Sequence, residues 1–252
     1  GTNTNTISLS GPGTFETEDG FSVDTSGSGG DGIYISTPSG ETGDTVFNDQ
    51  NASTITGANN FGDYGIDVAN DGTGALTITT TGTITGRAGI DAQSVNGTDL
   101  TITANEIITS GGDGVTASLG SGKIDINITG EINSAWDGIF LNANSGVTGI
   151  EITAPKITSN GNYDDGIRIN PNNDGALTID IDANIYASGP GNDGIDIGGS
   201  RSYPSADIFI TSSGAINAVD NGVEVEPDAT GGDIVMELNN NITGGDDGVH
   251  AE

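Results

Sequence analysis

The chain has 252 residues and carries 36 Asp and Glu against five Lys and Arg, which gives a formal net charge of −31. Five cations cannot neutralise a phosphate backbone, so the composition excludes nucleic acid as a partner, and an anionic membrane surface is excluded for the same reason. No stretch of the sequence is long and apolar enough to span a bilayer, so we expect this segment not to be embedded in a membrane.

The first residues are only weakly patterned. Ile7 and Leu9 alternate as in a short strand, residues 10–20 have the character of an insertion, and Val23 is one apolar position among polar neighbours. A stronger motif then begins, in which Gly is followed by Ile or Val, a free position and a second apolar residue. It recurs at Gly32, Gly65, Gly89, Gly114, Gly138, Gly166, Gly194, Gly222 and Gly248. This alternation is typical of a strand with one buried face.

Two more apolar columns lie between successive Gly motifs. The second column is an alternating pair such as Leu76 and Ile78, and we assign Ile7 with Leu9 and Val46 to it as weaker early members. The third column consists of single residues: Val23, Ile55, Ile84, Ile108, Ile132, Ile157, Ile185, Ile216 and Ile242. Turns rich in Gly, Asn, Asp, Ser and Thr separate the columns, as expected where left-handed backbone conformations are needed.

Three short strands in each interval of 24 to 33 residues, without a helical period, predict a parallel β-helix. We expect an all-β, right-handed solenoid of about nine coils, with right-handedness taken as the usual sense for coils of this size. A β-propeller is the nearest alternative, but its blades need four strands. Residues 1–252 are interpreted as one solenoid segment of a longer surface protein, with a second insertion at 198–206.

Aspartates precede many of the motif glycines. In "GNDGIDIGGS" (191–200), Asp193 and Asp196 stand three residues apart, a spacing that resembles a catalytic pair but follows from the repeat. We expect the Asp before each Gly to form its turn by hydrogen bonding to nearby backbone N–H groups. Because acidic, oxygen-rich turns suit Ca²⁺, a Ca²⁺ site is a second hypothesis for the aspartates that follow one another at this position, which are Asp113, Asp137, Asp165 and Asp193.

A few larger side chains interrupt the polar surface and are candidates for ligand binding. Trp136, Phe140 and Tyr163 fall close together in the repeat and could stack against a sugar or a protein, although aromatics that pack turns are commoner. Arg168 has Phe140 and Asp196 as neighbours in its column, which predicts a cross-strand ion pair and leaves a ligand contact open.

The same sequence argues against an enzyme. "GNDGIDIG" (191–198) superficially resembles a segment of polygalacturonases, which also need an Asp-Asp pair, a Gly-His-Gly and an Arg-x-Lys. Asp164 and Asp165 could supply the pair, but the one histidine is His250 and no Arg-x-Lys occurs. A lyase for acidic polysaccharides would need a cationic groove, which the charge opposes. A hydrolase of neutral glycans that uses two carboxylates stays open as the alternative.

Repeats such as "ALTITTTGTITGRAGIDA" (75–92), "KIDINITGEINSAWDGIFLNA" (123–143) and "DIVMELNNNITGGDDGVHAE" (233–252) resemble the adhesin-like passenger regions of bacterial autotransporters. The resemblance covers nearly the whole chain. It implies a secreted segment displayed at or released from the bacterial outer membrane. It further implies binding to a host-surface protein or glycan, or self-association between rods. A phage tail fibre, a glycan depolymerase and a passive stalk are the alternatives that this interpretation leaves open.

Overall fold

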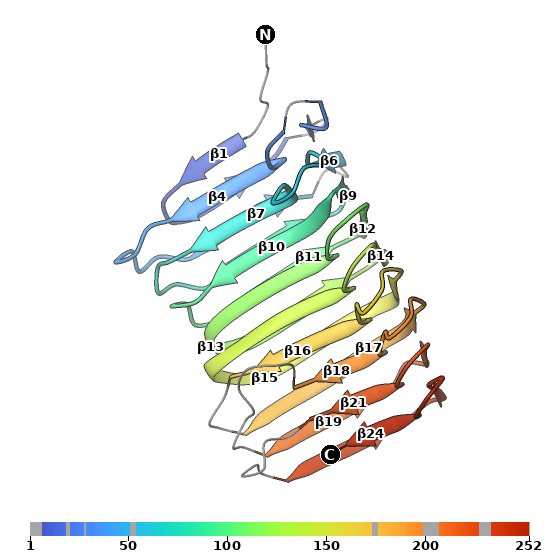
Figure 1. Cartoon of the computed structure of the whole chain (residues 1–252). Helices are drawn as coiled ribbons and strands as arrows, with labels where there is room; N and C mark the ends of the chain where they lie inside the picture. The colour runs from blue at the N-terminus through green and yellow to red at the C-terminus, as the bar shows by residue number, and fades with distance from the viewer. Residues whose placement is uncertain are drawn as a thin grey trace.

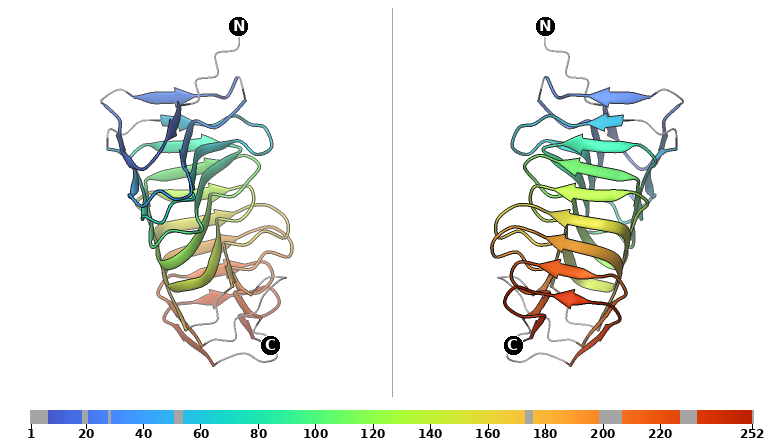
Figure 2. Two further views of the ribbon diagram at one scale, coloured as in Figure 1. Left: turned by 90° about the vertical axis from the view of Figure 1, so that its left-hand side faces the viewer. Right: turned by 90° about the vertical axis from the view of Figure 1, so that its right-hand side faces the viewer.

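The computed structural model describes residues 7–18, 21–27, 29–50, 54–172, 176–198, 207–226 and 233–251. Throughout those ranges the regular elements are β-strands, and each strand pairs in parallel with its counterpart in the next coil. The strands stack into one elongated, right-handed solenoid with β1 and β24 at opposite ends (Figure 1, Figure 2). The predicted parallel β-helix is confirmed, and its number of turns is close to the nine expected.

The Gly-motif strands form the first face of the solenoid. In stacking order they are β1 (Ile7–Ser10), β4 (Ile33–Thr37), β7 (Tyr64–Asn70), β10 (Ala88–Ser94), the start of β13 (Val115–Ile128), the start of β15 (Ile139–Ser159), β16 (Ile167–Pro171), β18 (Ile195–Ile197), β21 (Val223–Val225) and β24 (Val249–Ala251).

The second apolar column forms the second face. Its strands are β2 (Gly13–Glu16), β5 (Thr45–Asp49), β8 (Leu76–Thr80), β11 (Leu100–Ala104), the end of β13, the middle of β15, the start of β17 (Leu177–Ala187), β19 (Ile208–Ser212) and β22 (Ile234–Leu238).

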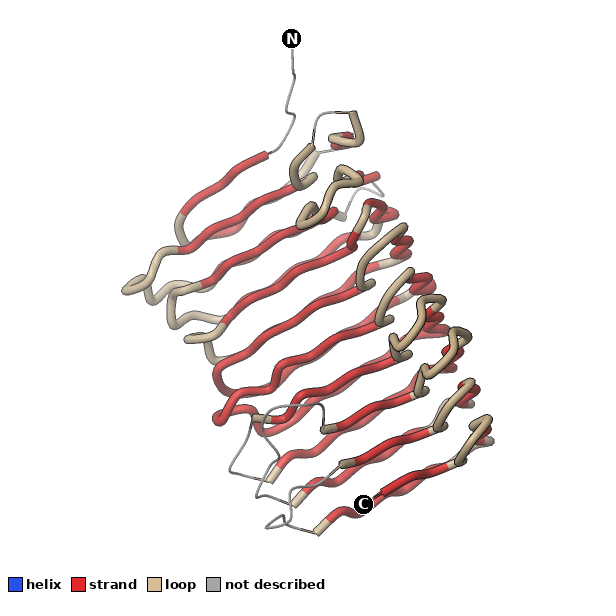
Figure 3. Tube along the Cα trace, in the orientation of Figure 1, coloured by secondary structure: helices blue, strands red, loops and turns tan. Residues whose placement is uncertain are grey.

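The third face is narrow. It contains β3 (Ser22–Asp24), β6 (Thr54–Thr56), β9 (Thr83–Gly86), β12 (Glu106–Thr109), β14 (Glu131–Ser134), the ends of β15 and β17, β20 (Ile216–Ala218) and β23 (Ile242–Thr243). The loops that lead from this face to the first face of the next coil, which we call the third-to-first turns, run down one edge of the rod (Figure 3).

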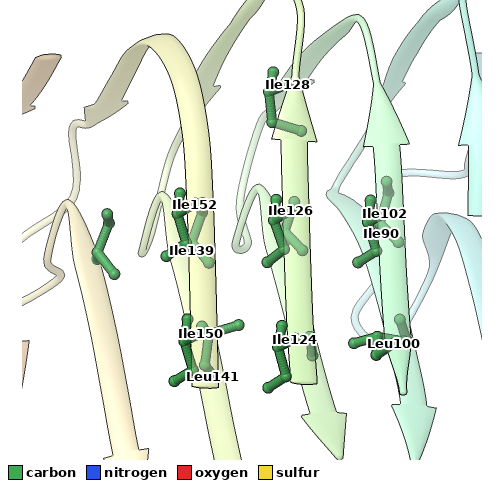
Figure 4. Close-up of a cluster of buried hydrophobic side chains, with 14 of the residues drawn as sticks. Ile90, Leu100, Ile102, Ile124, Ile126, Ile128, Ile139, Leu141, Ile150 and Ile152 are labelled. Carbon is green, nitrogen blue, oxygen red and sulfur yellow. The ribbon is translucent and has the colours of Figure 1, made fainter. Parts of the chain in front are cut away.

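The interior is a stack of aliphatic side chains from all three faces. Ile102, Ile126 and Ile152 lie above one another on the second face with no exposed surface, and the neighbouring columns repeat this arrangement (Figure 4). Because each coil buries its apolar residues against the coils before and after it, a chain with only 32% hydrophobic residues still forms a continuous core.

The motif glycine is needed where each third-to-first turn enters the first face. A Cβ atom on Gly138 would meet the Cγ2 of Ile157 and the carbonyl oxygen of Gly166 in the next coil, well inside normal contact distance. The equivalent glycines meet equivalent atoms along most of the rod. Close approach between coils therefore explains why glycine recurs at this position.

Two assignments in the first coil were wrong. Ile7 pairs with Ile33, which places β1 on the first face rather than in the second column. Residues 10–20 are not simply an insertion, because β2 lies within them and pairs Phe15 with Phe47 on the second face. A strand with a single large apolar side chain does not show the alternation by which the other strands were found.

Two residues that were assigned to the interior were also wrong, in each case by one position. Val46 points outward, and its neighbours Thr45 and Phe47 are buried in register with Leu76 and Ile78. Ile108 is 41% exposed, whereas Ile107 is fully buried in register with Ile84 and Ile132. The third-column assignment of Val23 is confirmed by its pairing with Ile55. The expected insertion at 198–206 lies, apart from Gly198, outside the described residues.

Candidate binding surface along the third-to-first turns

The aspartates before the motif glycines form a ladder along the rod. The backbone N–H of Asp137 donates to Oδ1 of Asp113 at 3.1 Å, and the same bond joins Asp165 to Asp137 at 2.5 Å and Asp193 to Asp165 at 2.8 Å. Asn221 continues the series with a bond to Asp193 at 2.7 Å. The prediction that each Asp bonds backbone N–H groups of its own turn is wrong, because the carboxylate accepts the backbone N–H of the equivalent residue in the next coil.

Burial dominates the electrostatics of this ladder. It raises the pKa of Asp113 to about 6 and that of Asp193 to about 8, where the neighbouring Glu224 adds to the rise. Each carboxyl group gains a backbone donor that opposes the rise without cancelling it. A carboxyl group that titrates near neutral pH can exchange protons with a ligand or with the solvent, so these groups are suited to respond to mild acid.

The Ca²⁺ hypothesis gains no support from this geometry. One oxygen of each ladder carboxylate is already committed to a backbone N–H group. Across the described ranges, no group of three or more His, Asp or Glu side chains is arranged to hold a metal ion. Ca²⁺ at Asp113, Asp137, Asp165 and Asp193 stays a prediction.

This prediction can be checked by thermal unfolding. If the ladder binds Ca²⁺ in the folded state only, millimolar Ca²⁺ will raise the melting temperature, because a ligand present at 100 times its dissociation constant stabilises a protein by about 2.7 kcal/mol. From the geometry we expect no specific rise, so Ca²⁺ and Mg²⁺ should act alike through screening. A rise that is specific to Ca²⁺ and is lost in Asp165→Asn would establish the site.

Arg168 lies on the first face at the centre of three carboxylates. Its guanidinium contacts Asp165 at 2.8 Å, Asp196 at 3.1 Å and Asp137 at 3.6 Å. The predicted ion pair with Asp196 is confirmed, and the register places Phe140 beside Arg168 on the adjacent strand. The contacts to Asp137 and Asp165 were not predicted. The guanidinium of Arg168 is therefore occupied by ion pairs that stabilise the fold.

Trp136 takes part in an exposed stack that reaches across several coils. The guanidinium carbon of Arg87 lies 4.8 Å from the centre of the Trp136 ring and 4.5 Å from that of Phe61. Gly111 lies beneath the Arg87 side chain, where a Cβ would sit against it at 3.4 Å. The sandwiched cation fixes both rings at the surface. Trp136 was predicted from the sequence as a candidate, whereas Phe61 and Arg87 were not.

Tyr163 lies on the turn one coil beyond Trp136, and its backbone is unusual. Its φ of 62° is in the left-handed region, where no other non-glycine residue of the described ranges is found. The ring lies over Gly191 and is 74% exposed. Bulky residues adopt this conformation at a cost, and such strain is found mainly at functional sites. The third-to-first turns thus display Phe61, Trp136 and Tyr163, which we call the aromatic edge.

The second face carries a separate feature, an open groove of about 660 Å³. Its lining includes Lys123 and three carboxylates, Asp125, Glu151 and Asp180, which lie in register on consecutive strands. None of these residues was predicted from the sequence, because the motif that guided the prediction lies on the first face. Alignment of the second column would have placed the three carboxylates in one row.

No family model, curated protein or solved structure matches the chain. In the described ranges, no helix is long and apolar enough to cross a membrane. The function must therefore be inferred from the geometry of the aromatic edge, of the Asp ladder and of the carboxylates in the groove on the second face.

Proposed function

We propose that the chain is a non-enzymatic adhesive segment of a secreted protein displayed on a bacterial cell surface. The observation that carries the proposal is the aromatic edge, where Phe61 is 83%, Tyr163 74% and Trp136 38% exposed along one side of the rod. Large apolar side chains held in solvent on a rigid scaffold are typical of binding surfaces. The repeats that resemble autotransporter passengers support this compartment.

Binding would combine weak contacts along the rod. Each aromatic ring contributes about 1 kcal/mol to the binding free energy when it contacts another ring or a comparable apolar face. The polar side chains that point outward from the first and second faces add hydrogen bonds. Because many such contacts act together, avidity supplies the affinity that no single contact reaches. The partner would be a host-surface protein or glycan, or another copy of the chain, and a polyanion is disfavoured by the charge of −31.

Replacing Tyr163 with glycine separates binding from stability. Glycine accepts a φ of 62° without strain, so Tyr163→Gly should melt at or above the temperature of the unchanged chain. The loss of an exposed ring should weaken adhesion about fivefold, as expected for a contact of about 1 kcal/mol. Adhesion is measured with protein-coated beads on immobilised extracellular-matrix proteins and on an array of neutral and charged glycans.

Phe209→Ala provides the matched control, because Phe209 is an aromatic residue that is 41% exposed on the second face. This variant should bind as the unchanged chain does. Equal losses in Tyr163→Gly and Phe209→Ala would show that the contact is not specific to the aromatic edge. Absence of binding to every surface, together with dispersed beads, would contradict adhesion and favour a passive stalk.

Self-association is tested with the same beads. Two rods of charge −31 repel each other, so homotypic contact requires neutralisation by divalent cations or by acid. Clumping that appears with added Ca²⁺ and disappears with EDTA would identify a second copy as the partner. Beads that stay dispersed at every Ca²⁺ concentration and at mildly acidic pH would leave a host protein or glycan.

A glycan hydrolase is the second candidate, and the groove on the second face favours it. Parallel strands are about 4.8 Å apart, so in-register carboxylates are separated by nearly the ~5–5.5 Å that retaining glycosidases use. Asp125 and Glu151 lie in register in this way, beside Lys123. Release of a product from neutral oligosaccharides would establish this function in place of simple adhesion.

A further inference from the structure

A second group of carboxylates lies on the first face, several coils before Arg168. Asp67 on β7 and Asp91 on β10 are in register on adjacent strands and point to the same face of the sheet. Neighbouring strands are about 4.8 Å apart, so residues in register on parallel strands have side chains at about this separation. Asp91 is only 5% exposed, and Asp67 is half-buried. Two carboxylates are thus held side by side, one of them almost completely buried.

Within the described part of the chain, the surroundings of the pair contain hydrogen-bond donors but no ion-pair partner. Oδ2 of Asp91 accepts a bond from Gln93 at 3.0 Å. Burial raises the pKa of Asp91, and the nearby Tyr64 side chain opposes that rise. Oδ1 of Asp91 is buried and has no hydrogen-bond partner among the residues that the structure describes. Among the described residues no ion pair involves Asp67 or Asp91.

The neighbouring carboxylate of Asp31 increases the negative potential at the pair. Asp31 lies in the turn before β4, where its Oδ1 accepts the Tyr64 backbone N–H at 2.8 Å. Tyr34 pairs with Asp67 from β4, and Asp113 lies in the turn before β13, close to Tyr64. Two ionised carboxylates at this separation in a partly dry site repel strongly, so one of them is expected to keep a proton.

We propose that Asp67 and Asp91 form a carboxyl–carboxylate pair that binds one proton at neutral pH. The proton comes from solvent and lies between the two side chains, so the otherwise unpartnered Asp91 Oδ1 gains a hydrogen bond. Burial together with the charge of Asp91 raises the pKa of Asp67 to about 7, which agrees with this arrangement. Loss of the proton places a second negative charge close to Asp31, whose carboxylate accepts the Tyr64 backbone N–H. The pair is independent of the adhesive function.

A pH titration of the carboxyl ¹³C resonances of the labelled full chain tests the proposal directly. We expect one step near pH 7 that is shared by the Asp67 and Asp91 resonances, and a second step in acid. Asp91→Asn removes the like charge, so the remaining Asp67 step should move down by at least about one pH unit. Asp67→Asn should shift the Asp91 step in the same direction.

Three results would overturn the proposal. The first is that both resonances have reached their fully ionised position below pH 5.5 in the unchanged chain. The second is an Asp67 step that stays in place in Asp91→Asn, since burial alone would then hold the proton. The third is a change of both resonances on addition of Ca²⁺ at pH 8, which would make the pair a metal site. Asp125→Asn, which removes an exposed carboxylate on the second face, should leave the near-neutral step unchanged.

Discussion

Gly138→Ala is expected to destabilise the solenoid by about 3 kcal/mol, at the upper end of the usual cost of overpacking. The new methyl group would collide with the Cγ2 of Ile157, which is fully buried, and with the carbonyl oxygen of Gly166. Neither atom can move away, because one is packed in the core and the other accepts the Ile139 backbone N–H at 3.1 Å, directly before the paired strand β16. Thermal unfolding followed by far-ultraviolet circular dichroism measures the loss.

Gly149→Ala is the matched control for this substitution. Its Cβ would meet nothing closer than 3.7 Å, and its backbone is not left-handed. Alanine is preferred to glycine inside a strand by about 0.5–1 kcal/mol, so this variant should be unchanged or slightly more stable. Equal melting temperatures for the two variants would contradict the close approach of coils as the reason for the repeated glycine.

The strands could be predicted because each inward position is fixed by the core while its neighbours are free. The prediction failed where two apolar residues are adjacent, as at Ile107 and Ile108, since alternation alone does not say which one is buried. It also failed at β2, where Phe15 is the single large apolar side chain. The pairing partners in neighbouring coils settle both cases, and they lie more than 20 residues away in sequence.

The functional surface was less accessible from the sequence. Arg87 and Trp136 each stand two residues before a motif glycine, and Gly112 occupies this position in the coil between them. Aligning that column would have shown that no side chain of the column separates Arg87 from Trp136, and the structure places the preceding Gly111 beneath the Arg87 side chain. Phe61 offers no such signal, because it stands four residues before Gly65 and so falls outside the column that aligns Arg87 with Trp136. The left-handed conformation of Tyr163 has no sequence signal either, because Tyr is not a residue that favours it.

Arg168→Met is expected to destabilise the chain at pH 8 by about 3 kcal/mol, the lower end of the cost of removing one partner from a buried ion pair. Burial opposes the charge of Arg168, but Asp137, Asp165 and Asp196 outweigh it and raise the pKa of the guanidinium. Methionine keeps the aliphatic part of the side chain and leaves the buried carboxylates without their cation. For a chain of this length the melting temperature should fall by about 6–12 °C.

The loss should shrink as the pH falls. Burial raises the pKa of Asp137 and Asp165, and Arg168 opposes the rise, so its removal raises both pKa values further. A carboxyl group whose pKa is higher in the folded than in the unfolded chain binds more protons when folded, so its contribution to stability is fully present below the unfolded pKa and is lost as the pH rises through the folded pKa. At pH 5 the carboxyls are neutral and the deficit should fall below about 1 kcal/mol.

Lys156→Met removes only the exposed pair with Glu131 at 3.4 Å, which is worth at most about 1 kcal/mol at any pH. A deficit in Arg168→Met that is equal at pH 5 and pH 8 would assign the role of Arg168 to packing rather than to charge.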